Sequence, residues 1–139
     1  MHFAFEPNLG ADSLLFGMRR DETRKLMAPF ELSTRAFSPN YDAYSEEGVK
    51  LGFDSQDLLA FIEIRNPSTA SFRRIDFFAF EFPEILEDMT SLALSMVYTV
   101  GCYIYPEAGI SIYAPNNQLL SVSLYKQGYY DDVLANVNK

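Results

Sequence analysis

The sequence contains few of the side chains that most often carry catalysis or bind metals. Its 139 residues include one histidine, His2, one cysteine, Cys102, and no tryptophan. We expect His2 to lie at a frayed terminus, which argues against Ser-His-Asp and Cys-His nucleophilic sites and against zinc sites built on histidine. Seven glycines are scattered along the chain, and none has the strand-turn-helix setting of a phosphate-binding loop.

Long apolar runs are also missing. The strongest, from residue 90 to 102, is interrupted by polar residues and is too short to span a bilayer. The N-terminal segment lacks the basic region and apolar core of a signal peptide, so we expect a cytoplasmic protein with no membrane segment. Cys102 stands within an apolar stretch and has no second cysteine to pair with, so we expect it to be a buried small hydrophobic residue.

Positive charge is absent from one long segment. No Lys or Arg occurs from residue 75 to 125, although the whole chain has eleven and its net charge is −8. Because binding to nucleic-acid phosphate depends on a basic face, nucleic acid is not an expected ligand. A basic protein is the electrostatically favoured partner, although an acidic surface also serves solubility alone. The segment contains six acids: Asp76, Glu81, Glu84, Glu87, Asp88 and Glu107.

Apolar side chains, by contrast, are plentiful. Hydrophobic residues make up 48% of the chain, and twelve Phe and nine Tyr are among its aromatic and apolar residues. A chain of this length fits one domain, here residues 1–139, and can bury roughly two-thirds of its unfolded surface without disulfides or metals. We therefore expect a single domain with a well-filled core.

Two helices and several strands are predicted. The first helix covers 19–28 and is stopped by Pro29. The second follows Pro83, where nearby acids favour a helix start and an apolar stripe of helical period runs from 85 to 97. Turn residues at 55–57 and at 115–117 each separate two extended segments and predict hairpins. The extended segments are 31–37, 48–54, 58–65, 71–80, 101–105, 109–114 and 119–126, and a short C-terminal helix is predicted at 129–137.

The two hairpins resemble each other. Residues 44–66 align with 105–127 without gaps at an offset of 61, with five identities in 23 positions, where chance gives about one or two. A helix precedes each hairpin, which favours a duplicated helix-plus-meander unit. The predicted fold is therefore α+β, with one antiparallel sheet or two half-sheets covered by helices on one face. The alternative is an undivided α+β sandwich whose hairpins share only turn signals.

Carboxylates are the other candidates for enzyme chemistry or for binding divalent cations. Each group already has a structural explanation, because Asp is favoured in hairpin turns and acids interact well with the dipole at a helix start. We therefore expect no enzyme, no metal and no cofactor, and we rank an uncharacterised carboxylate-dependent enzyme third among the functions considered. The groups are Glu46 with Glu47, Asp54 with Asp57, Glu84 with Glu87 and Asp88, and Asp131 with Asp132.

A binding function fits the sequence better. Tyrosine gives a large contact area at low entropic cost, and neighbouring carboxylates steer a basic partner toward it. Such combinations occur near predicted strand ends and near the C-terminus, although each ring could instead fill the core. The predicted partner-binding residues are Glu84, Glu87, Asp88, Tyr105, Glu107, Tyr129, Tyr130, Asp131 and Asp132.

The segment LFGMRRDETR, residues 15–24, is similar to the Gly-Met-x-x-x-x-Val helix start of small helix-plus-meander proteins. These include outer-membrane assembly lipoproteins and the tandem-repeat β-lactamase inhibitor proteins. Arg19 stands where threonine is common in those proteins, and no cysteine is placed to carry a lipid. The lipoprotein role is therefore not expected here.

In size, charge, fold class and its Gly-Tyr-Tyr-Asp segment at 128–131, the chain also resembles the small acidic immunity proteins of bacterial polymorphic toxins, including contact-dependent growth inhibition systems. This resemblance implies a non-enzymatic cytoplasmic protein, monomeric when free, that binds a basic toxin domain 1:1 and masks its surface. An acidic secretion chaperone or adaptor, usually a dimer, is the alternative. We find no apolar helix face left over for a dimer seam, which favours the immunity protein.

Overall fold

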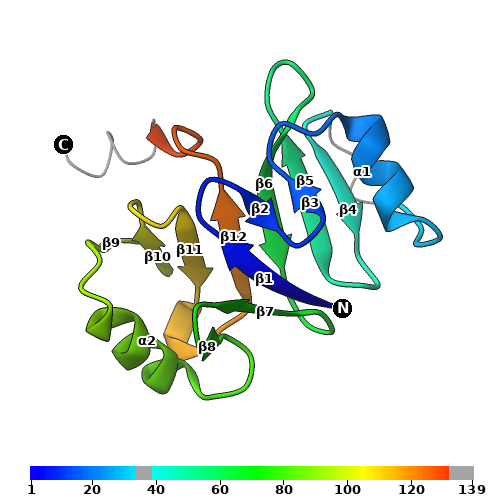
Figure 1. The fold of residues 1–139 in the computed structure, drawn as a ribbon. Helices are drawn as coiled ribbons and strands as arrows, with labels where there is room; N and C mark the ends of the chain where they lie inside the picture. Colours follow the sequence, from blue (N-terminus) through cyan, green and yellow to red (C-terminus); the bar gives the residue numbers. More distant parts are fainter. Residues whose placement is uncertain (34–38, 132–139) are drawn as a thin grey trace.

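The computed structural model describes residues 1–33 and 39–131, which form an α+β fold dominated by two sheets (Figure 1). The larger sheet has seven antiparallel strands in the order β4-β5-β6-β12-β11-β10-β9, and its two halves meet where β6 pairs with β12. Its strands are β4 (Tyr41–Tyr44), β5 (Val49–Phe53), β6 (Leu59–Ile64), β9 (Val97–Thr99), β10 (Cys102–Tyr105), β11 (Ile110–Tyr113) and β12 (Ser121–Tyr125), with the short 3-10 helix η1 (Pro115–Asn117) between the last two.

The smaller sheet has five strands in the order β3-β2-β1-β7-β8. Strand β1 runs parallel to β7, and the other pairs in this sheet are antiparallel. Its strands are β1 (His2–Glu6), β2 (Gly10–Ala11), β3 (Leu14–Leu15), β7 (Thr69–Phe72) and β8 (Ile75–Asp76), and the two helices are α1 (Arg20–Met27) and α2 (Phe82–Ser91).

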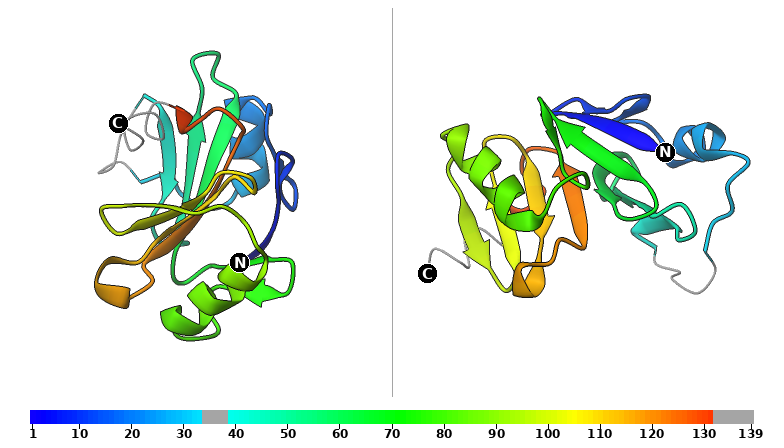
Figure 2. Two further views of the ribbon diagram at one scale, coloured as in Figure 1. Left: turned by 90° about the vertical axis from the view of Figure 1, so that its left-hand side faces the viewer. Right: turned by 90° about the horizontal axis from the view of Figure 1, so that it is seen from below.

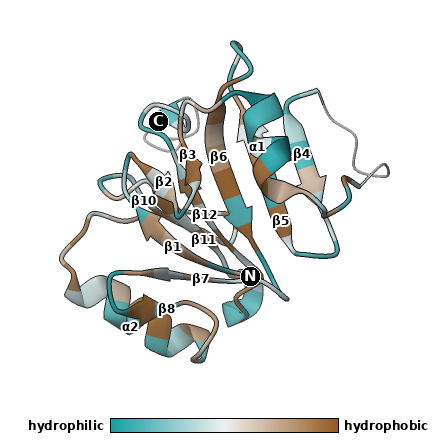
Figure 3. Ribbon diagram, turned by 45° about the vertical axis from the view of Figure 1, so that its right-hand side comes forward, coloured by the Kyte–Doolittle hydropathy of each residue, from teal (hydrophilic) through white to brown (hydrophobic). Residues whose placement is uncertain are grey.

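Both helices and the smaller sheet cover the same face of the seven-stranded sheet (Figure 2). Ile62 of β6 and Leu124 of β12 pair across the centre of the sheet and are fully buried in this layer, where Met27 of α1, Met89 of α2 and Phe5 of β1 join the same core. Strands β5 and β6 are coloured mostly hydrophobic in Figure 3, whereas α1 is mostly hydrophilic. The α+β class and the placement of the helices on one face are confirmed.

The smaller sheet has no counterpart in the sequence-based prediction. The single strand expected over 71–80 is instead the hairpin of β7 and β8, because the chain turns at Arg73, whose φ is 56°. The expectation of a frayed N-terminus is also wrong. Strand β1 lies between β2 and β7, and the His2 ring lies 2.6 Å from Thr69 Oγ1 and 3.0 Å from Ser71 Oγ. Parallel pairing joins segments far apart in sequence, so no local turn signal announces it.

The two predicted hairpins are confirmed, and each belongs to a meander, which has three strands (β4 to β6) in the first unit and four (β9 to β12) in the second. Tyr44 pairs with Val49 in the first meander, and Tyr105 pairs with Ile110 in the second. These pairs are separated by the offset of 61 residues that the sequence alignment uses. The β4–β5 and β10–β11 turns are therefore equivalent in register as well as in sequence.

A glycine occupies the same place in both turns. Gly48 and Gly109 have φ values of 72° and 67°, and a Cβ atom on either would clash with a backbone carbonyl oxygen, that of Arg65 or of Tyr125. The N–H of Arg65 donates to the Gly48 carbonyl at 2.8 Å, and that of Tyr125 donates to the Gly109 carbonyl at 2.8 Å. Only glycine combines this left-handed backbone with so close an approach.

The equivalence shifts by one residue in the last strand of each meander, β6 and β12. Gly52 pairs with Phe61, whereas Phe53 pairs with Leu59, so Ala60 is an extra residue in β6. Strand β12 has no such shift. The offset is therefore 61 up to Leu59 and 60 beyond the bulge, a change that an ungapped alignment does not find.

The second helix is shorter than its apolar stripe suggests. It ends at Ser91 rather than near residue 97, because Ala93 takes a φ of 58° and Val97 already begins β9. The side chains of Leu92 and Leu94 still pack against the core, so the stripe continues across a change of backbone conformation. Burial of their side chains therefore explains the apolar residues Leu92 and Leu94, and the helical period accounts only for the apolar residues up to Ser91.

A buried ion cluster fixes α1 to the sheet. Asp42 of β4 is 3% exposed and lies 2.8 Å from Arg20 Nη2 and 2.9 Å from Arg24 Nε. Burial on its own would raise the pKa of Asp42, but hydrogen bonds from the two guanidinium groups outweigh it and the pKa is lowered. Arg20 also donates to the carbonyl of Tyr41 at 2.9 Å, so the cluster holds both the side chain and the backbone of the strand.

Asp42→Asn should lower the free energy of unfolding by about 3 kcal/mol, because the variant removes the buried carboxylate that pairs with both Arg20 and Arg24 and leaves Arg20 its ion pair with the exposed Asp57. Urea unfolding measures this change as a lower midpoint at constant slope. Asp57→Asn is the control. Asp57 contacts the same Arg20 at 3.2 Å, but its side chain is exposed, so its loss should cost less than about 1 kcal/mol. Equal effects of the two variants would contradict the role of the buried cluster.

The contribution of Asp42 should also depend on pH. Its pKa is lowered in the folded state, so it stabilises the fold above its unfolded pKa of about 3.9 and this stabilisation is lost as the pH falls through the folded pKa. The difference in unfolding free energy between the wild type and Asp42→Asn should therefore shrink on acidification. Urea unfolding from pH 7 to pH 3 measures it, and a constant difference would show that the pKa of Asp42 is not lowered by folding.

Candidate protein-binding site

Helix α2 presents a row of carboxylates to solvent. Pro83 lies in its first turn, where the missing N–H costs no hydrogen bond, and Glu84 follows in the turn where the helix dipole favours negative charge. Ile85 and Met89 face the core and are fully buried. The apolar face therefore fixes the orientation of the helix and leaves three exposed acids on its outer side: Glu84, Glu87 and Asp88.

These three carboxylates have no ion-pair partner among the described residues. The nearest bases along this surface are Arg73 and Arg74, which line the same groove of about 470 Å³ as Asp88. The guanidinium of Arg73 lies 5.0 Å from the ring centroid of Phe72. The arginines therefore border the acidic row at one end and leave Glu84 and Glu87 uncompensated.

A second groove runs along the other side of α2. It has a volume of about 680 Å³ and lies between the helix and the η1 turn, where Asn117 forms its far wall. Phe82, Pro83 and Leu86 give it an apolar floor, and Glu87 stands at its edge. An apolar groove edged by a carboxylate is suited to an aliphatic side chain that ends in a positive charge.

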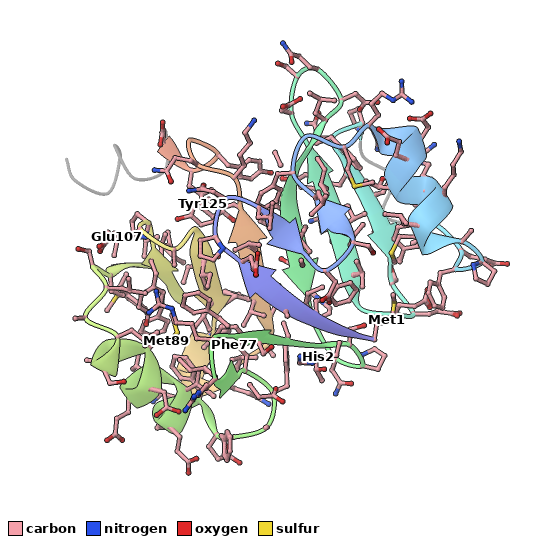
Figure 4. The ribbon with its side chains drawn as sticks, in the orientation of Figure 1. Met1, His2, Phe77, Met89, Glu107 and Tyr125 are labelled. Atoms are coloured by element: carbon pink, nitrogen blue, oxygen red, sulfur yellow. The ribbon has the colours of Figure 1, made fainter. Side chains whose placement is uncertain are left out.

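Glu107 extends the acidic surface toward β9. It is exposed on the turn between β10 and β11, and Figure 4 shows it above α2. The backbone N–H of Ser95 donates to Glu107 Oε1 at 2.5 Å, and this hydrogen bond lowers the pKa of Glu107. The bond joins the turn to the segment that connects α2 to β9, so Glu107 belongs to the same part of the molecule as the helix acids.

Exposed apolar side chains accompany these acids. Phe80 precedes α2, and Met96, Tyr98 and Val100 lie in and around β9. All four are among the most exposed large hydrophobic residues described, and Val100 is 89% exposed. Phe80 falls in the strand predicted at 71–80 and Met96 in the apolar stripe predicted for the second helix, so neither was expected at the surface. The combination of exposed apolar residues and unpaired carboxylates is the candidate site.

Tyr105 does not belong to this surface, contrary to the sequence-based prediction. Its side chain is 1% exposed and packs in the main core, where its hydroxyl has no hydrogen-bond partner among residues 1–33 and 39–131 and burial raises its pKa to about 12. Tyr44 occupies the equivalent position in the first meander and is equally buried. Both faces of the sheet are covered at this strand, so alternation along the sequence does not tell which tyrosines are outside.

Tyr129 and Tyr130 lie on the opposite face of the large sheet from α2. The Tyr129 ring stacks on Phe61 at 5.2 Å and its hydroxyl lies 3.1 Å from that of Tyr41, while Tyr130 contacts Tyr125 at 4.5 Å. Both are half-buried, and burial raises the pKa of Tyr130 to about 12. The structure therefore places these tyrosines away from Glu84, Glu87 and Asp88, with which they were predicted to form one binding site. Asp131 follows the tyrosines and is exposed. Asp132 lies outside the described residues, and so does most of the C-terminal helix predicted at 129–137.

Cys102 is half-buried in the same aromatic cluster rather than fully buried as predicted. Burial raises the pKa of its thiol, and the charge of Glu63 adds to the increase. A thiol with a raised pKa is a poor nucleophile and a poor metal ligand. It therefore acts as a small apolar group on this face.

The Asp54 carboxylate is explained by local structure. Asp54 accepts backbone N–H groups of Gln56 and Leu58 at 2.8 and 3.1 Å, which stabilises the β5–β6 turn. Over residues 1–33 and 39–131, no three His, Cys, Asp or Glu side chains come together as a metal site. Within the same ranges, neither helix is long and apolar enough to cross a membrane.

No protein-family model matches this chain, and comparison with curated proteins and with solved structures found no significant match.

Tyr105→Phe should leave stability unchanged or raise it by about 1 kcal/mol, because the variant removes a buried hydroxyl that has no partner in the described part of the chain. Thermal unfolding measures the change. Tyr98→Phe, at an exposed ring, serves as the control and should be neutral. A loss of more than about 1 kcal/mol in Tyr105→Phe would show that the hydroxyl makes a hydrogen bond.

Proposed function

We propose that this chain is a non-catalytic protein that binds a basic partner protein through the surface of α2. The observation that carries the proposal is the row formed by Glu84, Glu87 and Asp88, which is exposed and has no ion pair among the described residues. Uncompensated charge at an exposed site raises the association rate with an oppositely charged protein.

The distribution of charge between the two helix-plus-meander units supports this proposal. In the first unit, Arg20 and Arg24 of the helix are neutralised by Asp42 of the sheet. In the second, the helix contacts the sheet through aromatic rings, with Phe82 and Tyr103 at 5.1 Å between centroids. The second unit thus needs no cation to hold its helix, and its acids are left for an external partner.

Within this class, we propose an immunity protein that masks the basic surface of a toxin domain in a 1:1 complex. Exposed aromatic and apolar residues such as Phe80 and Tyr98 next to the acids support a tight interface, because buried anchors contribute most of the affinity while charges set the association rate. The partner to test is the toxin domain that an immunity protein of this kind would have encoded beside its own gene.

A secretion chaperone or adaptor is the second candidate. The apolar residues of β9, Tyr98 above all, lie at the margin of the large sheet and offer a seam for a homodimer. Light scattering separates the two candidates, since the immunity protein is expected to be a monomer when free. A stable dimer would favour the chaperone.

Reversing the charge of the acidic row should slow association. The triple variant Glu84→Lys, Glu87→Lys and Asp88→Lys should reduce the association rate with the neighbouring toxin by about tenfold or more at low salt, and the difference should shrink as salt screens the charges. Surface plasmon resonance at two ionic strengths measures both effects.

The control for this experiment reverses three exposed acids elsewhere: Glu6→Lys, Glu31→Lys and Glu46→Lys. It makes the same change in net charge, so a comparable loss of rate in both triple variants would show that overall charge matters and that the α2 surface is not the site.

A further inference from the structure

Strand β9 is an edge of the seven-stranded sheet. Its partner in the described part of the chain is β10, and no second strand is placed on its other side there. The other edge strand, β4, lies at the far end of the sheet (Figure 1). An exposed edge presents unpaired backbone groups to which an extended chain can add.

The register of the hairpin shows which backbone groups face outward. Thr99 pairs with Cys102 across a two-residue turn, and Tyr98 pairs with Tyr103. In a hairpin of this kind the pair next to the turn exchanges hydrogen bonds, and the following pair points its N–H and C=O groups away from each other. The amide and carbonyl of Tyr98 therefore face the open edge.

The turn of this hairpin is strained. Val100 and Gly101 have φ values of 45° and 81°, which define a type I′ turn. Such turns favour Asn-Gly, and a β-branched residue at positive φ is an outlier. Val100 is also 89% exposed, so no packing within the described structure compensates for the strain. Strained residues of this kind cluster at functional sites.

Side chains beside the edge supply apolar contacts and negative charge. Tyr98 is 56% exposed and its ring stands edge-on to that of Tyr103 at 5.0 Å, which fixes its orientation. Met96 is also exposed. Glu107 is bonded to Ser95, one residue before Met96, so a carboxylate stands at the start of the strand. No base lies anywhere from residue 75 to 125.

We propose that β9 receives an extended segment of the basic partner as an added strand. This inference rests on the function proposed above and specifies how the partner is held. The backbone of the segment pairs with Tyr98, its apolar side chains pack on Tyr98 and Val100, and a Lys or Arg of the segment reaches Glu107. An occupant of alternating basic and apolar residues fits both the charge and the shape of this edge.

Two variants of one residue isolate the backbone contribution. Tyr98→Pro removes the outward N–H without disturbing a hydrogen bond to β10, whereas Tyr98→Thr loses the same ring but keeps the N–H. The probe is an acetylated and amidated peptide, (Lys-Val)₃-Lys, titrated at low salt and followed by NMR shifts of the backbone amides. The matched peptide (Glu-Val)₃-Glu should not bind.

The proposal expects shifts at residues 97–101, and affinity at least about tenfold weaker for Tyr98→Pro than for Tyr98→Thr. Equal affinities of the two variants, or shifts on α2 without shifts at β9, would overturn strand addition. Dimerisation of the protein through β9 in light scattering would do so as well, because the occupant would then be a second copy of the chain.

Val100→Asn provides a readout that a purely structural role would not give. It places the favoured residue at the strained turn position and removes the apolar tip, so the melting temperature should rise while affinity for the peptide and for the neighbouring toxin falls. A rise in stability with unchanged affinity for both would remove Val100 from the interface.

The same variants in the toxin complex separate this inference from the proposed function. If charge reversal on α2 slows toxin association but Tyr98→Pro and Tyr98→Thr bind the toxin equally, strand addition is wrong and the acidic interface stands. If charge reversal has no effect while Tyr98→Pro abolishes binding, the edge is the site and the role given to α2 is wrong.

Discussion

The antiparallel pairing of β6 with β12 is the contact on which the whole architecture depends. It joins the last strands of the two meanders, so that a three-stranded unit and a four-stranded unit become one continuous sheet with a shared core. A lone three-stranded meander with one helix would leave much of its apolar face exposed. The smaller sheet then covers this junction from one side, with contacts between β2 and β12, and the aromatic cluster around Phe61 covers it from the other.

The two units solve the same packing problem with different chemistry. Each docks a helix on a meander through a buried methionine, Met27 in α1 and Met89 in α2. The first adds a charged cluster around Asp42, whereas the second uses the ring contact of Phe82 with Tyr103. A helix held to the sheet by ion pairs needs acids and bases together. A helix held by contacts between aromatic rings places no such constraint on the surface charge. This difference explains how one half of the molecule can carry acids alone.

Local signals in the sequence predict local structure well here. Pro29 and the turn residues around Asn116 place the end of α1 and the second hairpin correctly, because each acts on the backbone of its own neighbours. The parallel pairing in the smaller sheet and the burial of Tyr105 depend on contacts between distant segments, and no local pattern encodes them. The exposure of Val100 was missed for a different reason, since a β-branched residue is unfavourable at its turn position and does not signal a turn. The acidic row of α2 was predictable because a helix with a complete apolar face must expose the other side.

The bulge at Ala60 makes the two meanders non-interchangeable despite their common plan. Alternate residues of a strand point to opposite layers, so one extra residue exchanges the inward and outward sets beyond it. Consider a chimera in which the sequence of β12 replaces β6 at the offset of 61 residues that relates the turns. Ser123 would then occupy the buried position of Ile62. The two halves can therefore continue to diverge but cannot exchange these strands. Either strand can vary in composition, but recombination between them would need an insertion or a deletion.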